Sequence, residues 1–168
     1  MLVALAILSA PAHALQSPMS GPSLELGIGG GVASGGGAGS AHASLGWWFG
    51  RYDDEYALGR FTALLATPRV DVGSRGPTLT GLVELRRAMD LFVVAPYWML
   101  AAGPTIAEDG LGVAVRGGGG VKLRRSRTLG LTARLEAGVD VVSARVRPAV
   151  VATVGGGWSA PLRKRAPR

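Results

Sequence analysis

Cysteine is absent from this chain of 168 residues, which excludes a disulfide framework, a thiolate metal site and a catalytic thiol. Charged residues make up 17% of the sequence, below the roughly 25% that soluble domains usually carry. Long apolar runs are also missing. The most apolar stretch, Leu91 to Gly103, is shorter than the ~20 residues that a transmembrane helix needs, and Pro96 lies in its middle.

Glycine, in contrast, is abundant, with 27 residues where about 7% of a chain is usual. This excess argues against helices and favours turns, bends and close approach of neighbouring strands. The stretch Leu129–Val142 shows what replaces the helices, because apolar and polar or small residues alternate along it almost without error. A period of two over this length predicts a β-strand with two chemically different faces.

The same reasoning predicts eight strands, most of them 9–13 residues long, where a tilted membrane strand needs about 9–11. Turn residues between them fit an all-β, eight-stranded antiparallel up-and-down transmembrane β-barrel. The predicted strands are Leu24–Ala33, Ala41–Arg51, Tyr56–Leu65, Leu79–Arg87, Leu91–Ala102, Leu111–Leu123, Leu129–Val142 and Pro148–Trp158.

The polar faces of these strands carry charges of both signs diluted by many glycines, which suits a narrow barrel interior better than a solvated surface. We expect the apolar faces to meet lipid and the polar faces to line the lumen. The predicted lumen charge network comprises Glu84, Arg86, Arg116, Lys122, Arg134, Glu136 and Asp140.

Aromatic residues are only 6% of the chain, so their clustering toward strand ends is informative. On the expected topology they lie at the periplasmic edge, where an aromatic girdle is typical of membrane barrels. The predicted girdle comprises Trp47, Phe49, Tyr52, Tyr56, Phe92 and Trp158.

On these strands and faces, the chain resembles the small eight-stranded outer-membrane β-barrels of Gram-negative bacteria, the OmpA/OmpX-like group, over residues 24–158. The resemblance implies a monomer in the outer membrane that contacts membrane lipid and lipopolysaccharide, with a closed interior and surface loops. Such barrels usually end in a strand with a terminal aromatic residue, whereas here Trp158 is followed by Ser-Ala-Pro-Leu and a basic tail.

The segments outside the barrel are interpreted from their composition. Residues 1–14 have the apolar run and the Ala12-His13-Ala14 site of a secretory signal peptide, and residues 15–23 form an N-terminal segment. Residues 159–168 form a basic tail without interleaved aromatic residues, so nucleic-acid binding is not expected.

The connections of the predicted barrel are expected to be longer after odd-numbered strands, which would place them outside the cell. The longest is residues 66–78, and loops held by a rigid scaffold often carry recognition. Its excess of basic charge would suit lipopolysaccharide or an acidic surface partner. The candidate contact residues are Arg69, Asp71 and Arg75.

Two alternatives to a structural or surface-interaction role remain. A soluble periplasmic lipocalin-like barrel would turn its apolar faces inward to bind an apolar ligand. A barrel-borne lipid A deacylase would use His42 and Ser44, which share one strand face. The acidic stretch Asp53-Asp54-Glu55 has the hard oxygen ligands of a divalent-cation site, but we interpret it as a solvated acidic turn. No cofactor, metal ion or catalytic residue is assigned.

Overall fold

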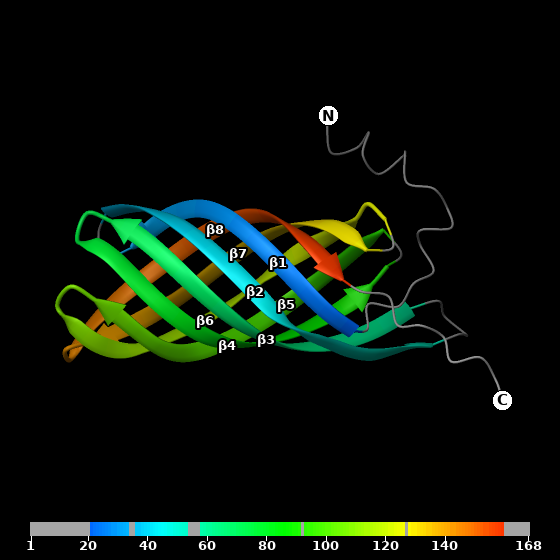
Figure 1. Cartoon of the computed structure of the whole chain (residues 1–168), viewed down its shortest axis with the longest axis horizontal. Helices are drawn as coiled ribbons and strands as arrows, with labels where there is room; N and C mark the ends of the chain where they lie inside the picture. The colour runs from blue at the N-terminus through cyan, green and yellow to red at the C-terminus, as the bar shows by residue number, and fades with distance from the viewer. Residues whose placement is uncertain (1–20, 34–35, 54–57, 92, 127, 160–168) are drawn as a thin grey trace.

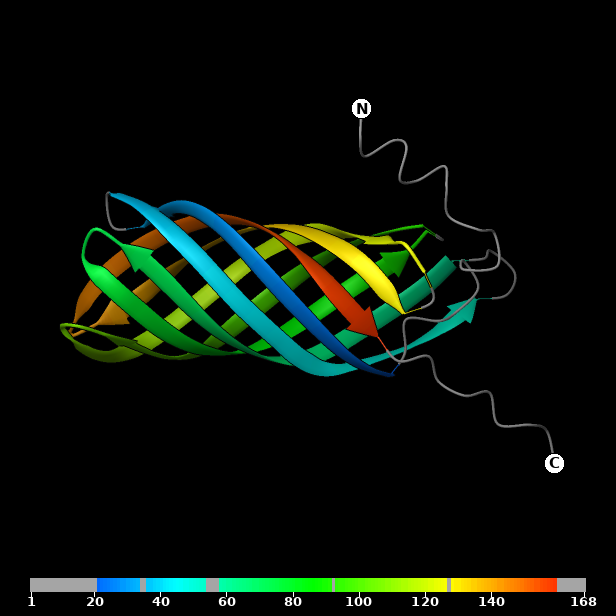
Figure 2. The same cartoon turned by 45° about the horizontal axis from the view of Figure 1, so that its top comes forward.

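The computed structural model describes residues 21–33, 36–53, 58–91, 93–126 and 128–159, without the side chains of 51–53 and 58. Each strand pairs antiparallel with the next, and the last pairs with the first to close a barrel (Figures 1 and 2). The predicted fold class is therefore confirmed. The strands are β1 (Gly21–Ala33), β2 (Gly36–Asp53), β3 (Leu58–Gly73), β4 (Gly76–Asp90), β5 (Val94–Ala107), β6 (Gly110–Arg124), β7 (Leu129–Val142) and β8 (Arg145–Ser159).

No helix among the described residues is long and apolar enough to cross a membrane.

The two ends of the barrel differ in their connections (Figure 1). At one end, here called the turn end, four pairs of strands are joined by only two residues each: 34–35, 74–75, 108–109 and 143–144. The other end, here called the terminal end, holds the start of β1, the end of β8 and the connections at 54–57, 91–93 and 125–128. The prediction of longer connections after odd-numbered strands is therefore wrong.

The expected long loop at residues 66–78 is instead the paired ends of β3 and β4 around a turn at Ser74 and Arg75. Pro68 looks like a strand breaker in the sequence, yet it lies inside β3 opposite Gly81. The ladder to β2 is interrupted beside it, because the pairs pass from His42↔Arg69 directly to Leu45↔Ala66. A proline is tolerated in a strand where no partner needs its N–H.

Pro96 is accommodated in a comparable way. It lies within β5 and pairs with Val121 of β6 in an unbroken register. On its other side the pairing between β4 and β5 ends at Ala88↔Tyr97, so the missing N–H has no β4 partner to lose.

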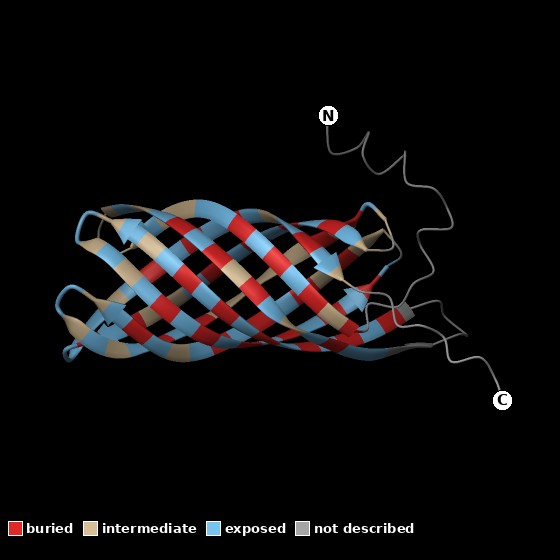
Figure 3. Cartoon of the chain, viewed as in Figure 1, coloured by how far each residue is buried: buried red, intermediate tan, exposed pale blue. Residues whose placement is uncertain are grey.

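Burial alternates along most of the strands, with buried and exposed residues forming bands over the barrel (Figure 3). In β7, Thr132, Arg134 and Glu136 are buried inside the barrel, whereas Leu131 and Leu135 are exposed on its outer surface. The polar face thus points inward and the apolar face outward, as the alternation in Leu129–Val142 predicts.

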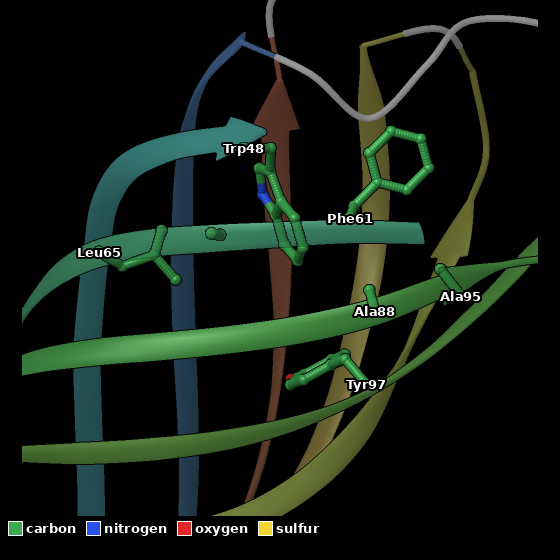
Figure 4. Packing of buried hydrophobic residues seen from close by; sticks show 7 residues of the cluster. Trp48, Phe61, Leu65, Ala88, Ala95 and Tyr97 are labelled. Atoms are coloured by element: carbon green, nitrogen blue, oxygen red, sulfur yellow. The ribbon is translucent and has the colours of Figure 1, made fainter. Parts of the chain in front are cut away.

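The interior is not polar throughout. At the terminal end, three inward-facing aromatic side chains, Trp48, Phe61 and Tyr97, pack with smaller apolar residues (Figure 4). A second apolar cluster comprises Leu82, Met99, Ala101 and Ala114. Glycine permits the close approach of strands around them: a Cβ atom at Gly103 would lie 1.9 Å from the carbonyl oxygen of Gly81 in β4.

Candidate functional site

A chain of ion pairs runs through the barrel from the terminal end toward the turn end. It begins with Glu25, near the start of β1, which accepts a hydrogen bond of 2.8 Å from Arg86 of β4. Arg86 also pairs with Glu84 two residues away on the same inner face. Glu84 lies 3.2 Å from Arg134 of β7, so three strands meet at these four side chains.

The same chain continues toward the turn end. Arg134 donates to Glu136 at 2.7 Å, and Glu136 lies 3.0 Å from Arg69 of β3. Arg69 then donates to Asp71 at 2.8 Å, close to the end of β3. Between Glu25 and Asp71, every charged side chain in this series of ion pairs therefore has a partner of opposite sign on each side.

Further polar contacts lie beyond both ends of this series of ion pairs. Toward the turn end, Arg116 and Asp140 approach to 2.5 Å. Toward the terminal end, Arg124 donates to Asp90 at 2.6 Å, and the ammonium group of Lys122 donates to Ser159 at 3.1 Å. The aromatic cluster also contributes, since Lys122 lies over the ring of Trp48 and Arg86 over the ring of Tyr97.

The charges described in the interior balance. Six carboxylates face six basic side chains in the pairs above, with His42 counted as neutral, and Arg147 with the partly exposed Asp109 adds one charge of each sign at the turn end. An ionised group taken out of water is costly unless it is paired, so the balance is what a narrow, desolvated lumen requires. The carboxylates belong to Glu25, Asp71, Glu84, Asp90, Glu136 and Asp140, and the basic groups to Arg69, Arg86, Arg116, Lys122, Arg124 and Arg134.

All seven residues of the predicted lumen network are buried inside the barrel. Sequence reasoning missed five others: Glu25, Arg69, Asp71, Asp90 and Arg124. A signal for Glu25 was present, because Leu24, Leu26 and Ile28 alternate around it. Asp90 and Arg124 are the last residues of their strands, where a short alternating pattern cannot show which face a side chain takes.

The outer surface of the strands is mostly apolar, in contrast to the charged interior. Its residues are aliphatic, aromatic, glycine, alanine or proline over most of the barrel height. Among the described outward-facing positions within the strands, only Arg60 of β3 and Arg87 of β4 are charged, and Thr62 lies beside them. Both arginines lie toward the terminal end.

Comparison with known proteins gives a match in structure and none in sequence. No family model matches the chain, and no curated protein does. Among solved structures, Neisserial surface protein A superposes with a TM-score of 0.55 at 13% identity, covering 83% of this chain and 96% of that one. The chain has the fold of the small eight-stranded outer-membrane barrels. Ail of Yersinia pestis and the N-terminal β-barrel domain of Pseudomonas aeruginosa OprF also match, with TM-scores of 0.31 and 0.30, identities of 10% and 15%, and coverage of 83% of this chain and 98% of each of those.

In this barrel the residues expected to form an aromatic girdle fall into two groups. Trp47, Phe49 and Trp158 are exposed on the outer surface, whereas the side chains of Tyr52, Tyr56 and Phe92 lie outside the described residues. Sequence reasoning missed Trp98, which is also exposed and pairs with Arg87 across β4 and β5. In the sequence it lies within the apolar stretch Leu91 to Gly103, where it does not stand out as a residue at a strand end.

Two of the three candidate surface-contact residues are placed elsewhere by the barrel. Arg69 is buried and Asp71 is largely covered, and the two pair with each other inside. The error follows from assigning residues 66–78 to a loop, since β3 continues to Gly73 and its alternation turns both side chains inward. Arg75 alone is exposed, in the turn between β3 and β4.

The His42 and Ser44 pair lies inside the barrel as well. The imidazole Nε2 of His42 is 3.8 Å from a carboxylate oxygen of Glu25, and Ser44 accepts a hydrogen bond of 3.0 Å from Thr67. Both residues are buried, so a lipid in the membrane would not reach them. Asp54 and Glu55 lie outside the described residues, as does the side chain of Asp53. Among the described residues, no group of three or more His, Cys, Asp or Glu side chains could hold a metal ion.

Proposed function

We propose that this protein is a monomeric outer-membrane barrel with a structural or surface-interaction role and a lumen closed to solutes. The observation that carries the proposal is the apolar outer surface. A soluble barrel would leave that surface in water, whereas the acyl chains of a bilayer match it. The structure turns the faces opposite to those of a lipocalin-like barrel, whose apolar side chains point inward toward a ligand.

The closed lumen follows from the size of the barrel and from its contents. Eight strands leave just enough interior space for side chains. Here the paired charges occupy the length of the interior, and Trp48, Phe61 and Tyr97 fill it at the terminal end. We therefore expect no continuous water column, and a role that depends on the barrel surface and its ends.

Because the strand number is even, both ends of the barrel segment lie at the terminal end. We propose that this end faces the periplasm, which puts the two-residue turns at the cell surface, although the surface loops of such barrels are usually the longer ones. The partners are then outer-membrane lipid and lipopolysaccharide. Any protein partner outside the cell would meet residues in or next to these turns, of which Arg75, Glu108, Asp109 and Arg145 are exposed. Such a contact is smaller than a long loop would provide.

Fractionation and labelling test the location and the orientation together. One variant carries an epitope tag between Glu108 and Asp109 at the turn end, and a matched variant carries it between Arg125 and Ser126 at the terminal end. Both should sediment with outer membranes, and antibody should label intact cells only for the first. Recovery in the soluble periplasm would refute membrane insertion, and the reverse labelling would invert the orientation.

Planar bilayers test the closed lumen. Purified protein should show no large, steady conductance, because the interior charges are paired and the apolar cluster fills the terminal end. Stable channels of porin size would show that the lumen is open.

A further inference from the structure

Among the side chains that the structure describes, two arginines are the charged residues on the outer surface of the strands, and they are neighbours. Arg87 of β4 pairs with Thr62 of β3, and Arg60 lies two residues before Thr62 on the same outer face. Arg60 and Arg87 are therefore diagonal neighbours, at the ~7–8 Å separation of such pairs in a sheet. Both are exposed, and neither forms an ion pair with a described residue.

The height of the two arginines fits a membrane interface. The outward-facing residues of β4 from Pro77 to Leu85 are uncharged, and Arg87 follows. At the usual tilt of 35–45° the strand rises about 26 Å along the barrel axis between Pro77 and Arg87, which matches an apolar band ~25 Å tall. Arg87 then lies at the border of that band, where headgroups begin.

The surroundings also suit headgroups. Trp98 lies directly beside Arg87 on β5, and Phe49 lies beside Thr62 on β2, so aromatic side chains flank the arginines in one row. Tryptophan is enriched at this depth, since its ring is apolar and its N–H can donate a hydrogen bond.

Two neighbouring positive charges with no carboxylate partner among the described side chains can bind an anion. The planar guanidinium group matches the geometry of a phosphate and binds it through two parallel hydrogen bonds. The leaflet around the terminal end would supply phosphates at this height. A lipid with net negative charge is favoured over a zwitterionic one, because two positive charges then meet one uncompensated negative charge.

From this arrangement we propose that Arg60 and Arg87, flanked by Trp98 and Phe49, form a binding site for the phosphate headgroup of an anionic phospholipid at the terminal end. The inference rests on the proposed membrane location. It adds a defined lipid site to the general contact of a barrel with its bilayer.

Binding of phosphatidylglycerol and phosphatidylcholine to the folded protein in detergent micelles, measured by native mass spectrometry, tests the site. The native protein should bind the first phosphatidylglycerol more tightly than phosphatidylcholine. Arg60→Gln and Arg87→Gln should each weaken the binding of phosphatidylglycerol about fivefold, as expected for the loss of one arginine at a charged membrane surface. The double variant Arg60→Lys, Arg87→Lys keeps both positive charges and should retain part of the preference for phosphatidylglycerol. Arg75→Gln combined with Arg145→Gln removes two exposed arginines from the opposite end and should leave the preference unchanged.

Folding of each variant is checked by its heat-modifiable mobility in gels. Equal binding of the two lipids by the native protein would overturn the inference, and so would an unchanged preference in the Arg60→Gln, Arg87→Gln double variant. Either result could occur in a protein that sediments with outer membranes, whereas recovery from the soluble periplasm would instead refute the proposed location.

Discussion

Replacing Glu84 by glutamine should destabilise the barrel far more than the same change at the exposed Glu108. Glu84 is fully buried and contacts Arg86 and Arg134 from two different strands. Removing one partner of a buried ion pair usually costs about 3–5 kcal/mol. We expect about 3 kcal/mol, the lower end of this range, because each arginine keeps a second carboxylate: Arg86 stays 2.8 Å from Glu25 and Arg134 stays 2.7 Å from Glu136.

The free energy of unfolding can be measured by reversible urea titration in lipid vesicles, followed by tryptophan fluorescence. Glu108→Gln is the matched control and should cost less than ~0.5 kcal/mol, as surface changes usually do. A double-mutant cycle with Arg134→Gln isolates the direct pair, and its two changes should be less than additive. A cost for Glu84→Gln no greater than that of the control, or full additivity in the cycle, would refute the argument that these interior charges depend on one another.

Two further predictions concern the outer surface and the glycines. Leu135→Arg should lower the free energy of unfolding by ~2–4 kcal/mol in the same titration, and Leu129→Arg by only ~0–1 kcal/mol. Both residues face outward on β7, but Leu129 pairs with Trp158 at the terminal end, near the membrane border. Equal costs would contradict the membrane placement. Gly103→Ala should lower the free energy of unfolding by ~1–3 kcal/mol, as overpacking does, because its Cβ would lie 1.9 Å from the Gly81 carbonyl oxygen. Gly156→Ala should be close to neutral, since nothing lies within 4 Å of its Cβ position, and a cost equal to that of Gly103→Ala would disprove the steric explanation.

The turn lengths illustrate where sequence reasoning failed. Pro68, Gly73 and Gly76 have the composition of a loop, and residues 66–78 were assigned to one for that reason. The paired ends of β3 and β4 instead continue to a turn at Ser74 and Arg75. Whether a proline is tolerated in a strand depends on its neighbour across the sheet, and composition does not contain that information.

Sequence by itself determined the strands and the sides of the barrel on which most residues lie. Successive side chains of a strand point to opposite faces, so the parity of a position in an alternating segment predicts its exposure. This is why Glu84, Arg134 and Glu136 were placed inside and Leu135 outside before any strand was paired with another. The same parity, applied to residues 58–73, would have turned Arg69 and Asp71 inward.

Only the tertiary structure decided which interior residues meet. Arg86 and Glu25 are 61 positions apart in the chain, and Arg69 and Glu136 are 67 apart. Their contacts depend on the stagger of neighbouring strands and on closure of β8 against β1, which set the height of each side chain in the lumen. The same holds for Arg60 and Arg87, which are unremarkable in sequence and become neighbours because β3 and β4 pair in one particular register. Alternation is a local property of one strand, whereas register and closure are properties of the whole sheet.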